Sequence, residues 1–194
     1  ILEGEPTSKA RSIYEFSKGT TGDKNLVAVW KPCEYSIKLD TKGGKIEEYP
    51  SSYFYLDRDY VIPTPEKKDY VFLGWKTVGD KSGKLDSRYT IQSGDMGDVT
   101  LEAVWEAKKY YIDYDLDGGK LAKGVENPSY YTVLDKDFAL ANPTRSGYTF
   151  LGWAENPYAT YTTYSLRYTV MTDRSSDLSL TATWAPIEYS ISYD

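Results

Sequence analysis

A run of alternating aspartates is the part of the chain best placed to bind a metal ion. Asp113, Asp115 and Asp117 precede Gly118, and carboxylates at this spacing begin the calcium loop of an EF-hand. That loop also needs an acidic ligand at its twelfth position, where this chain has Gly124, and helical flanks, which the sequence does not indicate. We therefore interpret the aspartates as carboxylates on the outer face of a strand, and we predict no metal site.

The residue types that most often catalyse reactions are scarce. The chain has no histidine, which removes the commonest general base and the commonest metal ligand. Its single cysteine, Cys33, permits neither an internal disulfide nor a thiolate metal cage. Aspartate and glutamate are plentiful, but no pair of them stands out as the acid and base of a hydrolase. We predict no catalytic residue, no cofactor and no enzymatic activity.

Three tyrosines in one loop are the best candidates for contact with a partner. Tyr158, Tyr161 and Tyr164 form a cluster that has no counterpart earlier in the chain. Aromatic residues in loops often contribute to binding, so a host or bacterial surface protein, or a glycan, is the expected kind of partner. Packing of the three rings against a neighbouring part of the same chain is the alternative.

The bulk composition excludes two other kinds of partner. The formal net charge is −6, whereas a nucleic-acid-binding protein normally presents a basic patch. No stretch approaches the roughly 20 apolar residues that span a membrane. We predict no nucleic-acid binding and no membrane insertion by this segment. The 20 tyrosines instead favour half-buried β-strands.

The elements that must position these residues belong to an internal repeat. Residues 147–153 read Gly-Tyr-Thr-Phe-Leu-Gly-Trp, and residues 69–75 read Asp-Tyr-Val-Phe-Leu-Gly-Trp. Each motif is followed by a strand-like segment that ends in a second tryptophan. A small unit needs its largest apolar side chains inside, so we predict a structural core that contains Trp30, Trp75, Trp105, Trp153 and Trp184. A sugar-stacking platform is the alternative role for these rings.

Alternating apolar and polar residues set the expected strands and boundaries. We predict strands at 35–40, 53–56, 70–75 and 99–105, a weaker one at 89–92, and the same order from residue 110 onward. Four residues separate each closing tryptophan from the next tyrosine and span at most about 14 Å, so we expect a rod of closely spaced units. The expected divisions are 1–34 (the C-terminal half of a truncated repeat plus connector), 35–109 and 110–188 (complete repeats), and 189–194 (the first strand of a further repeat).

The order of these motifs resembles a known family. A strand, a Gly-Gly turn, a proline, Gly-Tyr-Thr-Phe-Leu-Gly-Trp and a closing Leu-x-Ala-x-Trp strand are similar to the Listeria–Bacteroides repeat, called the B repeat in internalins. The resemblance covers nearly the whole chain. The first repeat departs from the pattern at Asp69, where the second has Gly147, and at Val71, where the second has Thr149, and these departures affect only the local turn.

The resemblance implies both a fold and a role. The expected fold is mainly β, α+β at most, with tandem β-grasp-like sheets in a bacterial surface protein, either secreted or held at the cell wall. The first hypothesis is a non-enzymatic extracellular module that acts as a stalk, or spacer, or presents an adhesin. The alternative is a glycan- or protein-binding module that uses its loop aromatics, including one accessory to a secreted hydrolase.

Overall fold

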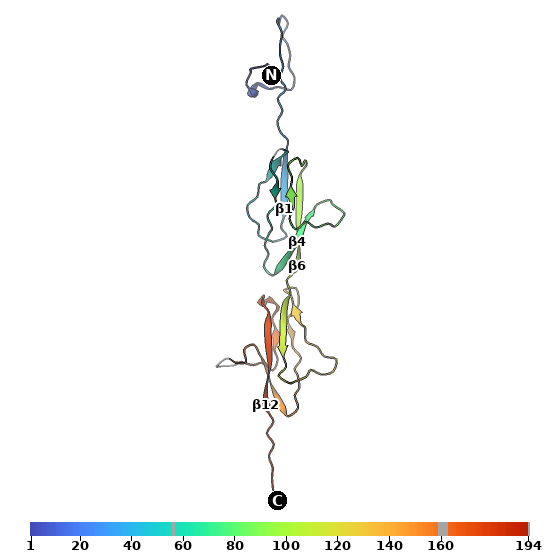
Figure 1. Ribbon diagram of the computed structural model, residues 1–194, viewed down its shortest axis with the longest axis vertical. Coiled ribbons are helices and arrows are strands. Elements are labelled where there is room, and N and C mark those ends of the chain that lie inside the picture. The colour runs from blue at the N-terminus through green and yellow to red at the C-terminus, as the bar shows by residue number, and fades with distance from the viewer. Residues whose placement is uncertain (56, 159–162, 194) are drawn as a thin grey trace.

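The computed structural model describes residues 1–55, 57–158 and 163–193. It contains two four-stranded sheets, one after the other along the chain, and Figure 1 shows the two sheet units end to end along the long axis of the molecule. Among the described residues the only helical elements are two short 3-10 turns, Thr7–Lys9 and Thr172–Arg174. The prediction of a mainly β protein with tandem sheet units is therefore confirmed.

The first unit is built around a central parallel pair of strands. Its sheet has the order β2-β1-β6-β4, with β1 antiparallel to β2 and parallel to β6. This is the strand order of a β-grasp sheet. A separate two-stranded ribbon pairs β3 with β5 and contributes Ile91 to the core. The strands are β1 (Glu34–Asp40), β2 (Ser52–Phe54), β3 (Tyr60–Val61), β4 (Tyr70–Thr77), β5 (Thr90–Ile91) and β6 (Val99–Ala107).

The second unit repeats this arrangement. Its sheet has the order β10-β12-β7-β8, and its ribbon pairs β11 with β9. A register shift interrupts the pairing of β10 with β12 between Phe150 and Gly152, as it interrupts β4 with β6 between Phe72 and Gly74. The strands are β7 (Tyr110–Asp115), β8 (Tyr130–Tyr131), β9 (Phe138–Ala139), β10 (Tyr148–Ala154), β11 (Thr169–Val170) and β12 (Leu178–Pro186).

Each unit has its own hydrophobic core. Alternate residues of the closing strands point inward, so that Leu101 and Leu180 are completely buried. The two cores use equivalent positions and consist of Ile37, Tyr53, Ile62, Trp75, Ile91, Val99, Leu101 and Ala103 in the first unit, and of Tyr110, Ile112, Tyr131, Leu140, Trp153, Val170, Leu178, Leu180 and Ala182 in the second.

The five tryptophans have three different environments. Trp75 and Trp153 are each 1% exposed and lie at the centres of the two cores. Trp105 and Trp184 are partly buried at the core margins. Their indole nitrogens donate to the carbonyls of Thr41 and Leu116 at 3.0 and 3.2 Å. Trp30 has the third environment, because its side chain is exposed to solvent.

Trp30 contradicts the prediction that all five tryptophans are core residues, because it is 89% exposed. The Trp105 ring is covered by the Phe72 ring, with centroids 5.3 Å apart, and by the backbone around Thr41. Residues 1–34 contain no counterpart of these covering segments, so Trp30 has nothing to pack against. The sequence also gave no signal for the ribbon strands β3 and β9, which are only two residues long.

The first 34 residues nevertheless keep one feature of the repeat. Leu2 bridges Leu26, and the Glu3 amide donates to the Asn25 carbonyl at 3.0 Å. The first unit has the same register, with Thr77 opposite Leu101 and the Val78 amide bonded to the Thr100 carbonyl at 2.9 Å. We therefore propose that residues 1–34 are the C-terminal half of a repeat. The boundaries given above for the four divisions stay predictions.

Candidate partner-contact surface

The loop that precedes β12 is fixed by contacts that both units share. The Tyr131 hydroxyl donates to the Ser176 carbonyl at 2.6 Å, and the Asp177 carboxylate accepts from the Tyr111 amide at 2.8 Å. In the first unit Tyr53 donates to the Gly97 carbonyl at 2.7 Å, and Asp98 accepts from the Ser36 amide at 2.7 Å. These bonds hold the loop against the first two strands of each unit, β1 and β2 or β7 and β8, and so position the side chains of the loop.

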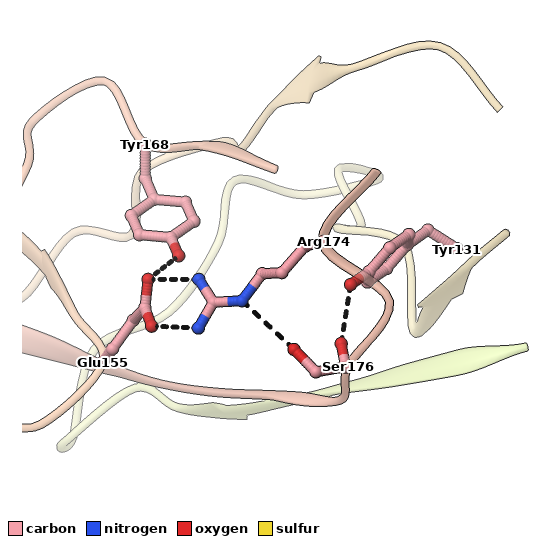
Figure 2. Close-up of polar contacts among 5 residues, drawn as sticks. All are labelled: Tyr131, Glu155, Tyr168, Arg174 and Ser176. Carbon is pink, nitrogen blue, oxygen red and sulfur yellow. Dashed lines mark hydrogen bonds and ion pairs between the residues drawn. The ribbon is translucent and has the colours of Figure 1, made fainter. Parts of the chain in front are cut away.

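In the second unit this loop carries an arginine that meets a carboxylate at the end of β10. The Arg174 guanidinium binds both oxygens of Glu155, at 2.7 and 2.5 Å. The Tyr168 hydroxyl donates to the same carboxylate, and the Arg174 Nε donates to the Ser176 hydroxyl at 3.2 Å (Figure 2). A two-pronged contact of this kind fixes orientation as well as charge.

The cluster shifts the pKa values of its members. Hydrogen bonds from Arg174, and secondarily from Tyr168, hold the pKa of the Glu155 carboxyl below its ordinary value of 4.5 although burial opposes them. Burial raises the pKa of Tyr168, and its hydrogen bond to Glu155 raises it further. At neutral pH the site therefore presents an ionised carboxylate, a guanidinium and a neutral phenol.

The fold of the repeat does not require this cluster. Thr77 stands in the first unit where the second has Glu155, and Asp95 stands where it has Arg174. Only the tyrosine is shared, because Tyr89 occupies the place of Tyr168. The sequence did not lead us to predict this cluster. The one visible indication was that the second unit has Arg174 where the first has Asp95.

The loop tyrosines lie beside this cluster. Tyr164 is 50% exposed and lines a hollow together with Trp153, Glu155, Asn156 and Tyr168. Tyr158 is 94% exposed and lies outside that lining. Tyr161 lies outside the described residues. The structure thus brings one of the three predicted tyrosines next to the charged cluster. The hollow combines an aromatic ring, an amide and a carboxylate, a set that can stack on and hydrogen-bond to a polar ligand.

Two of the three alternating aspartates have other partners. The Asp115 carboxylate accepts from the Asp117 amide at 2.9 Å, and Asp117 forms an ion pair with Arg145 at 3.1 Å. Among the described residues no group of three or more histidine, cysteine, aspartate and glutamate side chains is arranged to hold a metal ion. The burial of Trp75 and Trp153 likewise leaves those two rings unable to serve as a sugar-stacking platform.

Replacing Glu155 with glutamine will lower the stability of the second unit in a pH-dependent way. The pKa of Glu155 is lowered by folding, so its ionised form stabilises the fold above the ordinary value of 4.5, and this contribution is lost as the pH falls through the lower folded pKa. The difference in melting temperature between the wild type and Glu155→Gln should be largest at neutral pH and should close in acid. It should correspond to about 1 kcal/mol or less, because both side chains are more than a third exposed. Glu126→Gln is the control, and a difference that is constant with pH would contradict the prediction.

Across the described residues, no helix has the length and apolar character that crossing a bilayer would require.

Comparisons with known proteins match the repeat. The family model described as the Listeria-Bacteroides repeat domain matches residues 35–104 and 110–183. Two proteins of Evansella cellulosilytica described as membrane proteins, one of them Gly-rich, are 26% and 28% identical over 87% of this chain. Internalin H of Listeria monocytogenes is 32% identical over 46% of the chain. The chain spans only 18%, 24% and 15% of the lengths of these relatives. No solved structure matches it.

Proposed function

Because the chain belongs to the Listeria-Bacteroides repeat domain family, we propose that it is a non-enzymatic repeat module of an extracellular bacterial surface protein. Its role is to space other domains of that protein, or an adhesive region, away from the cell. The names of the relatives support this location, since one is an internalin and two are described as membrane proteins.

The arrangement of the two units is the observation that supports a spacer. The closing strand β6 ends at Ala107 and the opening strand β7 begins at Tyr110, so only two residues connect the sheets. A connector this short keeps neighbouring units close and restricts their relative motion. Each added unit therefore lengthens the molecule along one axis (Figure 1), and repeat arrays of this kind are stabilised unit by unit.

Deletion of a unit from the full-length protein tests the spacer role. Removing residues 110–188 should lower the height above the cell surface of an epitope tag placed at the end of the chain that lies farther from the cell, measured by super-resolution microscopy. Replacing the deleted residues with a second copy of residues 35–109 should restore the height. Adhesion of the cells is measured on the same variants. If the deletion abolished adhesion, and the inserted copy folded and restored the height but not the adhesion, the second unit would have a binding role of its own. An unchanged height after deletion would overturn the proposal.

A binding module is the second candidate, supported by the hollow that Tyr164 lines beside Glu155. In this role the second unit holds a glycan or a protein, either as an adhesin or next to a catalytic domain of a secreted hydrolase. Binding of the chain to a glycan array and to surface-protein extracts should be lost in Tyr164→Ala. It should be retained in Tyr55→Ala, which removes a tyrosine of similar exposure (45%) from the first unit. Equal binding by both variants would count against this candidate.

A further inference from the structure

Residue 69 occupies a turn that favours glycine. It precedes β4 with a φ of 64°, in the left-handed region, and the Tyr70 amide donates to the Lys67 carbonyl at 3.2 Å. The same turn in the second unit has Gly147, with a φ of 78°. Glycine adopts this conformation without steric cost, whereas any residue with a side chain adopts it less readily, aspartate being among the more tolerant. The aspartate is thus not the residue that the turn itself favours.

The backbone of this turn makes the same contact in both units. The Asp69 carbonyl accepts from the Lys108 amide at 2.9 Å, and the Gly147 carbonyl accepts from the Ile187 amide at 2.9 Å. Both bonds tie the turn to the connector that leaves the unit. The backbone alone therefore closes this end of the sheet. The side chain of residue 69 takes no part in that contact and can interact with other residues.

That side chain reaches into the second unit. The Tyr110 hydroxyl donates to the Asp69 carboxylate at 2.7 Å, and the Ser175 side chain acts on the same carboxyl group by lowering its pKa. The Asp69 side chain is only 14% exposed. The interaction with Ser175, and then the hydrogen bond from Tyr110, hold the pKa of the Asp69 carboxyl below its ordinary value, and the charges of Lys68 and Lys108 add to the effect. The carboxylate is therefore charged and enclosed between the units.

The two partners are fixed parts of the second unit. Tyr110 is 5% exposed, belongs to the core and packs against the Tyr131 ring at 5.6 Å, so its hydroxyl has little freedom. Ser175 follows the 3-10 turn Thr172–Arg174 and has a φ of 59°. One contact comes from the first strand of the sheet and the other from the loop before its last strand. The Asp69 side chain thus meets two separate elements of the second unit, whereas the Lys108 amide bond closes the turn within the first.

We propose that Asp69 pins the second unit to the first, and that the residue at this position of each repeat sets the stiffness of the junction that follows it. An aspartate gives a pinned junction. A glycine, as at Gly147, has no side chain and leaves only the backbone bond, here from the Ile187 amide. The inference concerns the geometry of the chain and holds for a spacer and for a binding module alike.

Distance measurements between spin labels test the pin. Lys38 and Asp113 are exposed and occupy equivalent places on the first strands of the two units. A chain with Cys33→Ser, Lys38→Cys and Asp113→Cys should give one narrow distance distribution by pulsed electron paramagnetic resonance. Adding Asp69→Gly or Tyr110→Phe should reduce the ratio of the narrow to the broad component by about tenfold or more, since a hydrogen bond to a charged group contributes at least the ~1.4 kcal/mol that a tenfold ratio requires. Asp69→Asn, which keeps an acceptor without the charge, should give an intermediate ratio.

Stability measurements separate a pin from a residue that only supports its own turn. Asp69→Gly should leave the melting temperature of the first unit unchanged or raised, because glycine suits the left-handed conformation. Tyr53→Phe is the matched control, since it removes a tyrosine hydroxyl that bonds to Gly97 inside the first unit, and it should leave the distance distribution narrow. A distribution that is already broad in the parent chain, or that stays narrow in Asp69→Gly, would overturn the proposal. If Tyr110→Phe unfolds the second unit, the outcome for Asp69→Gly alone decides.

Discussion

Replacing Trp153 with alanine will remove much of the stability of the second unit and leave the first unit folded. Trp153 is 1% exposed, and the rings of Tyr114 and Phe150 pack edge-on against it, with centroids 5.6 and 5.8 Å away. Truncating such a side chain typically costs about 3–5 kcal/mol. A unit of this size has roughly 4–11 kcal/mol in total, at ~0.05–0.15 kcal/mol per residue.

Urea unfolding followed by near-ultraviolet circular dichroism would show two transitions, with the one from the second unit at much lower denaturant. Trp75→Ala should give the reciprocal result, because each unit has a core of its own and repeats couple mainly through their interfaces. Tyr164→Ala, at a half-exposed ring, should cost less than about 1 kcal/mol. If Trp153→Ala cost no more than Tyr164→Ala, the assignment of Trp153 to the core would be wrong.

Replacing Gly152 with alanine will destabilise the second unit almost as much. Gly152 has a φ of 142°, and a Cβ atom there would lie 2.6 Å from the Ser165 carbonyl carbon and 2.8 Å from its amide nitrogen. The obstacle is backbone, which two hydrogen bonds of 3.0 Å between Ser165 and Trp153 hold in place. The strained conformation costs about 1–3 kcal/mol, and the overpacking adds a similar amount, about 1–3 kcal/mol.

The first unit supplies the matched control. Gly74 has nearly the same φ, 146°, but a Cβ atom there would come no closer than 3.1 Å to its neighbours, Leu85 and Asp86. Gly74→Ala should therefore lose the stability that the strained backbone conformation costs, but only a small part of what overpacking costs. Denaturant unfolding of both variants would measure the difference. Equal losses of unfolding free energy in the two variants would mean that the close approach of Ser165 to Gly152 does not cause the destabilisation.

Several features follow from the sequence alone because they depend on local periodicity. Side chains alternate across a strand with a period of two, so the spacing of Leu178, Leu180 and Ala182 predicts the buried face of β12 wherever the strand lies. The tryptophan motif recurs with the same pattern of strands around it, so it likewise predicts two equivalent sheets. The signal is strong where strands are long, as at Tyr70–Thr77, weak for the two-residue ribbon strand Thr90–Ile91, and absent for Tyr60–Val61.

The Gly-Gly turn shows where local reasoning becomes incomplete. The sequence indicates a tight turn at Gly118-Gly119. The structure adds that a Cβ atom on Gly119 would lie 2.4 Å from the Trp184 ring, so the second glycine is needed for the approach of a side chain 65 positions away. No local pattern records that distance, because it depends on the path of the chain between the two residues.

The contacts of greatest functional interest likewise join residues that are far apart in the sequence. Arg174 meets Glu155 across 19 residues and Tyr110 meets Asp69 across 41, and each pair spans different elements. Trp30 carries the same local pattern as Trp105 yet remains exposed, because the segments that cover Trp105 have no counterpart within residues 1–34. The sequence by itself therefore determined the type of each unit and the buried face of its long strands. Which side chains meet was decided by strand register and by the short connector, since both act through the folded path of the chain.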